Sequence, residues 1–267
     1  MYPHQLLRSV ECTHMIRFLV TILTVLLFAP ITHATNPTPE DLLEGAIKAI
    51  GGKHAIESLE SFELHGMIRL PDGRPVIEID LATSRGGKVL AVQTFVGIGQ
   101  TRFGSDGTTS WEETPSPSKK QVFKLIDDKI LSQKVKQLNW IEWLTKLPLQ
   151  LDVIKVLGET EFEGETCWEI SISNKNKIDS REKAYFSKAT KRLIGRQTTE
   201  HTNDEDAIVN IYFRDWKPVG DLQLFHTVVF NRGGVEVAMV FDTIEVNSVD
   251  DGIFDLPTAV VQLRVNE

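Results

Sequence analysis

The chain has 267 residues, of which 41% are apolar and 25% are charged, so its composition is that of a globular protein rather than a disordered one. It has 29 Lys and Arg against 37 Asp and Glu, a net charge of −8, which argues against a nucleic-acid-binding protein. Its two cysteines exclude a fold held by a disulfide framework and are too few for a structural zinc site without histidine ligands.

The N-terminus has the order of a secretory signal. Arg17 precedes an apolar run of 12 residues from Phe18 to Ala29, and residues 32–34, Thr-His-Ala, place small residues before a possible cut. The run is short of the ~20 residues that cross a bilayer as a helix. An uncleaved N-terminal anchor is the alternative.

We therefore expect a Sec-type signal peptide at residues 1–34, with Met15 as an alternative start, and a single domain at residues 35–267. No cysteine lies just after the apolar run, so the acylation site of a bacterial lipoprotein is missing. The expected location is periplasmic or secreted. Cleavage leaves a net charge of −9 and one cysteine, Cys167, which we expect to be buried in the core.

Two segments of the mature chain have helical signals. Thr38 is suited to cap a helix with Pro39 at its first position, and Gly51-Gly52 ends it. Apolar residues at steps of three and four predict a second, longer helical segment over 119–147, ended by Pro148.

The rest of the mature chain alternates apolar and polar residues with a period of two, which predicts strands. The expected strands are 61–70, 76–81, 88–96, 100–103, 108–112, 153–157, 167–173, 181–187, 192–201, 207–216, 222–231 and 235–246. Tight turns such as Pro71-Asp72-Gly73 join them, which is typical of an antiparallel meander.

A single sheet of about eleven strands does not stay flat. We expect a mainly β (α+β) fold, in which one strongly curved antiparallel sheet forms an unclosed barrel and helices cover its concave face. Few helices are available, so an apolar groove should remain. The residues expected to line it are Phe95, Trp140, Trp143 and Leu144; ordinary core packing is the alternative for the tryptophans, including Trp111, Trp168 and Trp216.

No catalytic, metal or cofactor motif is present in the sequence. There is no His-Glu-x-x-His, no Gly-x-Ser-x-Gly and no phosphate-binding loop. We expect no catalytic residue, no metal and no cofactor, and hence not an enzyme. A hydrolase would require at least two of His65, His201 and His226 to meet acidic residues in one pocket.

Several motifs in order along the chain resemble the LolA/LolB-like family of periplasmic lipoprotein carriers, or lipoprotein-sorting-protein-like domains. They are a helix ending in a double glycine within 46–66, the segment Asp106-Gly107-x-x-x-Trp111, a mid-chain helical insertion, the strand pair 158–172 and 184–197, and the closing segment 244–257. The resemblance implies an unclosed β-barrel with a helical lid and a hydrophobic cavity that binds acyl chains without chemistry. The missing acylation site makes the chain similar to the soluble carrier, whereas the family's cavity arginine has no evident counterpart.

The expected function is therefore a soluble exported carrier or chaperone for a lipid, a lipoprotein acyl chain or another hydrophobic ligand. Its expected partners are a lipid or lipidated protein and an envelope membrane-protein complex, with no nucleic acid and no metal. The alternatives are a structural or interaction module of an envelope complex and, second, an uncharacterised hydrolase.

Overall fold

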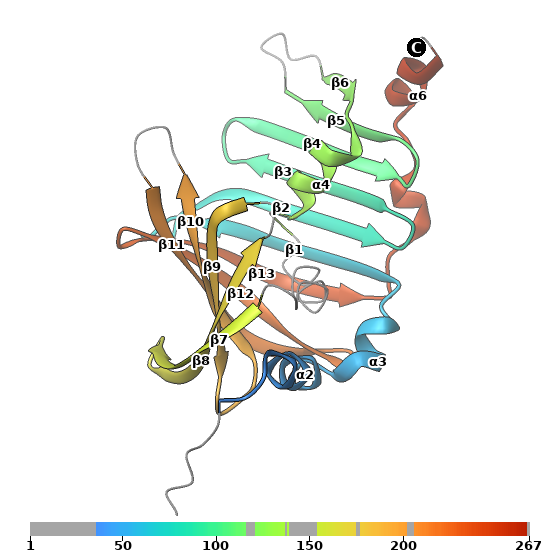
Figure 1. Ribbon diagram of the computed structural model, residues 1–267. Helices are drawn as coiled ribbons and strands as arrows, with labels where there is room; N and C mark the ends of the chain where they lie inside the picture. Colours follow the sequence, from blue (N-terminus) through green and yellow to red (C-terminus); the bar gives the residue numbers. More distant parts are fainter. Residues whose placement is uncertain are drawn as a thin grey trace, which may run out of the picture. The chain divides into compact units, whose positions relative to one another are not determined.

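One antiparallel sheet dominates the protein (Figure 1). The structure, a computed structural model, describes residues 36–115, 121–136, 138, 154–174, 177–201 and 206–265. Their 13-stranded sheet has the order β6-β5-β4-β3-β2-β1-β13-β12-β11-β10-β9-β8-β7. Strand neighbours in the sheet are also neighbours in the sequence, except at the junction of β1 with β13.

The strands are β1 (Ser61–Arg69), β2 (Pro75–Ser84), β3 (Lys88–Phe95), β4 (Gly99–Asp106), β5 (Ser110–Thr114), β6 (Val122–Leu125), β7 (Ile154–Phe162), β8 (Glu165–Asn174), β9 (Lys177–Ser187), β10 (Leu193–His201), β11 (Asp206–Val219), β12 (Leu222–Arg232) and β13 (Val235–Val246). The helices are α2 (Pro39–Ala49), α3 (Gly52–Glu57), α4 (Asp128–Lys136), the 3-10 turn η2 (Asp251–Phe254) and α6 (Thr258–Val265).

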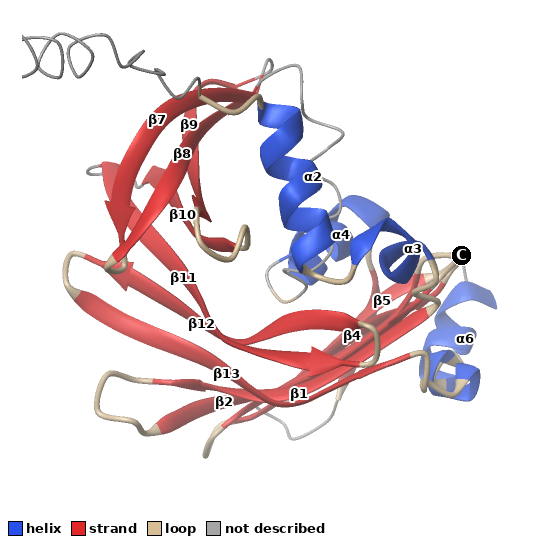
Figure 2. Ribbon diagram, turned by 90° about the horizontal axis from the view of Figure 1, so that it is seen from below, coloured by secondary structure: helices blue, strands red, loops and turns tan. Residues whose placement is uncertain are grey.

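The sheet curls but does not close. β6 and β7 form its two edges and do not pair with each other. Figure 2 shows α2, α3 and α4 on the concave side and α6 outside. η2 contacts β3 and β4, and α6 contacts β6. The expected fold, a single curved antiparallel sheet with helices on its concave face, is confirmed.

Local sequence signals explain where α2 begins and ends. Thr38 Oγ1 accepts from the backbone N–H of Asp41 at 3.1 Å, and Asp41 Oδ2 accepts from the N–H of Thr38 at 3.1 Å, a complete capping box. Gly51 follows with φ +123°, and a Cβ there would collide with the carbonyl of Asp221. The carbonyl of Ile50 accepts from Gln223 N at 3.0 Å, so the α2–α3 joint is fixed against the start of β12.

The helix expected over 119–147 is only partly correct. Residues 122–125 form the strand β6 instead, which pairs with β5, and the helix in this region is α4, over 128–136. Residues 116–120, 137 and 139–153 lie outside the described part of the chain. Three of the four residues in 122–125 are apolar, a pattern that fits either a helix or a strand. The segment forms a strand because it pairs with the free edge of β5.

Apolar side chains from both halves of the sheet and from α2 and α4 form one core on the concave side. A smaller cluster lies on the opposite face of β8, β9 and β10. It contains Cys167, Tyr185 and Ile194, with Phe162 packed against it. Cys167 is fully buried, as expected, and burial raises the pKa of its thiol to about 11.

Candidate ligand pocket on the concave face

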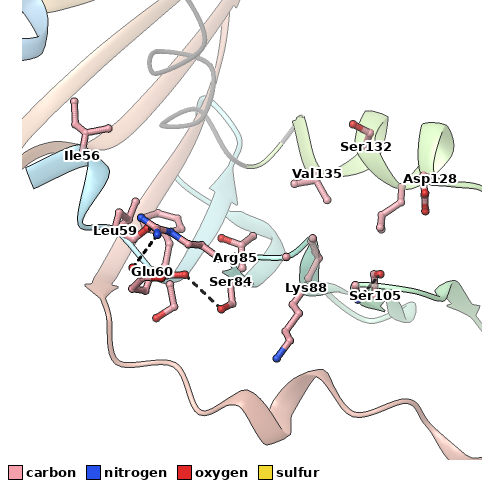
Figure 3. Close-up of a pocket in the computed structure, with 18 residues that line it drawn as sticks. Ile56, Leu59, Glu60, Ser84, Arg85, Lys88, Ser105, Asp128, Ser132 and Val135 are labelled. Atoms are coloured by element: carbon pink, nitrogen blue, oxygen red, sulfur yellow. Dashed lines mark hydrogen bonds and ion pairs between the residues drawn. The ribbon is translucent and has the colours of Figure 1, made fainter. Parts of the chain in front are cut away.

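A pocket of about 550 Å³ lies between α4 and the ends of β1 to β4 (Figure 3). Binding sites for small molecules have volumes of about 300–1,000 Å³. Its lining combines apolar, hydroxyl and charged side chains. The lining residues are Ile56, Leu59, Glu60, Ser61, Phe62, Thr83, Ser84, Arg85, Gly86, Gly87, Lys88, Val89, Ser105, Gly107, Asp128, Leu131, Ser132 and Val135.

The floor of the pocket is one row of cross-strand neighbours. Phe62 is opposite Thr83, Thr83 is opposite Val89, and Val89 is opposite Ser105. Residues opposite each other on adjacent strands point to the same face of a sheet. Three members of this row are small, so space remains beneath α4.

The roof of the pocket is α4. Leu131 and Val135 lie one helical turn apart and are both buried, so they share the face turned toward the sheet. Ser132 and Asp128 also line the pocket from this helix, as Figure 3 shows. The pocket is therefore apolar between the helix and the floor and polar along the helix edge.

A buried carboxylate holds α4 above the sheet. Glu112 projects from β5 to the concave face, and its side chain is 7% exposed. Its oxygens accept from Lys124 Nζ at 2.8 Å and from Lys134 Nζ, on α4, at 2.7 Å. Burial alone would raise the pKa of Glu112, but the hydrogen bonds and charges of the two lysines outweigh it and hold this pKa below its ordinary value.

A second polar contact holds the start of the same helix. Ser110 Oγ donates to Asp128 Oδ1 at 2.9 Å. The roof is thus attached to β5 at Glu112 and at Ser110, two positions on one strand.

One cation stands at the mouth of the pocket, and it is already engaged. Arg85 pairs with Glu60 at 3.0 Å and donates to the backbone carbonyls of Leu59, at 3.3 Å, and Glu57. Lys88 alternates with Val89 of the floor, so its side chain points away from α4 (Figure 3). Its Nζ pairs there with Asp251 at 2.7 Å.

The residues expected to line a cavity are placed differently. Phe95 is half-buried on the concave face, opposite Ile77, at the end of β3 away from the pocket, and it does not line the pocket. Trp140, Trp143 and Leu144 lie outside the described residues. The pocket instead uses the β2–β3 turn and the two strand ends beside it, which sequence reasoning did not single out as a site. Thr83 and Ser105 carry hydroxyl groups at positions where strand alternation predicts core residues. This pattern was the sequence signal that could have revealed the pocket.

The described tryptophans belong to packed regions rather than to this pocket. Trp111 neighbours Glu112 in the sequence and so points to the convex face, where it is 2% exposed and lies 5.9 Å from the ring of Phe123. Trp168 is buried in the concave core of the second half of the sheet. Trp216 packs edge-on against Phe225.

A charged pair that sequence reasoning missed lies on the concave face of the second half. Arg196 is 6% exposed, is opposite Ala184, and pairs with Glu182. Burial lowers the pKa of Arg196, whereas Glu182 opposes this effect. Its position depends on a register shift in β10 between Leu193 and Gly195, which strand periodicity alone does not reveal.

The histidines do not meet in the pocket. His65 lies on β1 and contacts Asp80 at 2.6 Å on the convex face, and this hydrogen bond raises the pKa of His65. His226 is buried on β12, and the side chain of His201 lies outside the described residues. The described residues include no group of three His, Cys, Asp or Glu side chains suited to a metal ion. None of their helices has the length and apolar content of a membrane span.

No protein-family model and no curated protein matches the sequence. Among solved structures, a LolA superfamily protein from Nitrosomonas europaea aligns with a TM-score of 0.52 and 12% identity, over 83% of this chain and 99% of that one. A DUF1329 family protein from Desulfovibrio piger aligns with a TM-score of 0.52 and 10% identity, over 83% of this chain and 98% of that one. The curled, unclosed sheet and these alignments show that the chain has a LolA-like fold.

Proposed function

We propose that residues 35–267 form an exported, periplasmic or secreted carrier. It binds a lipid, a lipoprotein acyl chain or another hydrophobic ligand on the concave side of the sheet and performs no chemistry on it. The observation that carries the proposal is the open pocket beneath α4, with Phe62 below and Leu131 and Val135 above. The LolA-like fold supports it, because in this chain the unclosed sheet and the helices on its concave side leave space for a ligand between them.

The energetics of burial suit this function. Each buried methylene contributes about 0.8 kcal/mol, so ten methylenes supply about 8 kcal/mol before the entropic costs of association. Binding of this kind needs no charged anchor, which fits an acidic protein whose pocket cations are neutralised. The partners are a lipid or lipidated protein and, at delivery, an envelope membrane-protein complex.

Direct binding tests the proposal. Native mass spectrometry of the purified mature chain should show a co-purified lipid, and the uncharged dye N-phenyl-1-naphthylamine should become fluorescent on binding. Leu131→Asp places a charge in the pocket and should weaken dye binding at least tenfold. The matched control is Leu157→Asp on edge strand β7, where Leu157 is 45% exposed, and it should bind the dye normally. Absence of both lipid and dye binding would refute a carrier function.

Export is tested separately. In a Gram-negative host, the full chain should appear in the periplasmic or secreted fraction, with its N-terminus at Thr35. Retention of residues 1–34 on a membrane-bound product would favour the uncleaved anchor.

A further inference from the structure

Among the residues that the structure describes, the mouth of the pocket offers no unpaired cation. Arg85 uses its guanidinium on Glu60 and on two backbone carbonyls, and Lys88 points away from the pocket and pairs with Asp251. A ligand anion would have to displace one of the acceptors of Arg85. Burying a charged head without a partner costs several kcal/mol.

Carboxylates at the mouth add to this barrier. Glu60 and Asp128 both line the pocket, and together their formal charges exceed the single positive charge of Arg85. A carboxylate or phosphate head would therefore meet a neutral to negative mouth.

The pocket does offer uncharged hydrogen-bonding groups. Five hydroxyl residues line it, and the hydroxyls of Thr83, on the floor, and Ser132, on the roof, have no hydrogen-bond partner among the described residues. Ser105 Oγ accepts from Gly107 N at 3.0 Å and keeps its own proton to donate. These hydroxyls both donate and accept, so they suit hydroxyl, ester or amide groups.

We propose that the pocket selects acyl lipids with an uncharged, hydroxyl- or ester-bearing head and discriminates against carboxylate and phosphate anions. The acyl chain lies against Phe62, Leu131 and Val135, and the head bonds to the hydroxyls of Thr83 and Ser132. This inference rests on the proposed carrier function, because it names the ligand class of the same pocket.

Two probes of equal chain length test it. Monolauroylglycerol and laurate differ in the charge of the head, and calorimetry with the mature chain at pH 8, below the micellar concentration of each, measures both affinities. We expect monolauroylglycerol to bind at least tenfold more tightly. Equal or tighter binding of laurate overturns the charge selectivity, whereas no binding of either probe overturns the carrier function itself.

A charge-release variant tests the cause. Glu60→Gln removes the carboxylate partner of Arg85. Laurate should then bind at least tenfold more tightly than to the natural chain, while monolauroylglycerol changes less than twofold. Both side chains of this pair are more than half exposed, so the loss of stability should be small.

The matched control removes another paired carboxylate. Glu159→Gln takes the partner of Lys188 near the β7–β8 hairpin and changes the net charge equally. It should leave both affinities unchanged. An equal gain of laurate binding in this control would assign the effect to total charge and overturn selection at the mouth.

Discussion

The two halves of the concave face are built from the same curled sheet but filled differently. In the second half, Trp168, Phe186 and Phe213 turn inward and are all nearly inaccessible to solvent. In the first half, Thr83, Val89 and Ser105 occupy the row beneath α4. Curvature alone therefore does not make a pocket. Side-chain volume decides where the concave side is a packed core and where it remains open.

The charged groups of the two halves differ in how deeply they are buried. Arg196 and Glu182 form their pair within the wall of the filled half, where Arg196 is buried. Arg85 stands at the mouth of the open half, and its side chain is 57% exposed. The filled half should contribute mainly stability and the open half mainly binding, and the predictions below separate these roles.

The largest effect should follow a cavity in the filled half. Phe186→Ala removes a ring that is 1% exposed, and such truncations lower the free energy of unfolding by about 3–5 kcal/mol. The comparison variant, Val89→Ala on the pocket floor, should lower it by about 1 kcal/mol because its surroundings are already open. Urea unfolding of both variants measures the difference. Equal losses would show that the two halves are packed alike.

The second effect concerns the attachment of α4 over the open half. Glu112→Gln removes a charged acceptor from Lys124 and Lys134 and should lower the free energy of unfolding by about 2 kcal/mol at pH 7. The folded-state pKa of Glu112 lies below its ordinary 4.5, so its contribution is present above pH 4.5 and is lost as the pH falls through the lower, folded-state value. Stability curves from pH 7 to pH 3 should therefore converge for the variant and the natural chain, and parallel curves would contradict this role.

The third effect should appear in binding rather than in stability. Ser132→Trp places a large ring into the pocket from an exposed position on α4 and should weaken dye binding by about tenfold, equivalent to about 1.4 kcal/mol. The melting temperature should hardly change. Ser58→Trp, at the end of α3 and outside the pocket lining, is the control and should bind normally. Unchanged binding in Ser132→Trp would place the ligand elsewhere on the concave face.

The smallest effect lies on the convex face. Asp80 raises the pKa of His65 above 6.5, so the pair stabilises the fold fully below that pH and loses its contribution as the pH rises through the higher, folded-state value. Asp80→Asn should return the pKa of His65 toward 6.5, as NMR titration would show. The change in stability should remain below about 1 kcal/mol because both side chains are half-exposed.

Much of the fold is predictable because its signals are local. The cap at Thr38, the alternation in β1 and the turns between strands depend on residues close in sequence, and they were read correctly. The structure of the segment 122–125 was not predicted correctly, because it depends on pairing with β5. The convex position of Trp111 likewise follows from the register of β4 and β5, through the pair with Gly104.

The candidate site was less predictable than the fold. Large aromatic residues attract attention as cavity walls, yet the described tryptophans fill packed regions, and the pocket lies where most of the floor residues are small. An empty volume depends on how far α4 stands above the sheet, which the contacts of Glu112 set. The ion pair that Lys88 forms away from the pocket depends on Asp251, 163 residues away, and no local pattern encodes it.

The junction of β1 with β13 has a consequence for the timing of folding. At this junction Phe62 is opposite Val246. β1 pairs on one side with β2, which follows it directly, but its other neighbour, β13, comes only near the end of the chain. Such long-range pairing slows folding and delays burial of the first strand. A chain that crosses a membrane with its N-terminus first would keep β1 half-paired until nearly all of it had emerged. The arrangement that makes the half-barrel continuous would thus leave an exported chain incompletely paired, and in need of protection, until its last strand emerges.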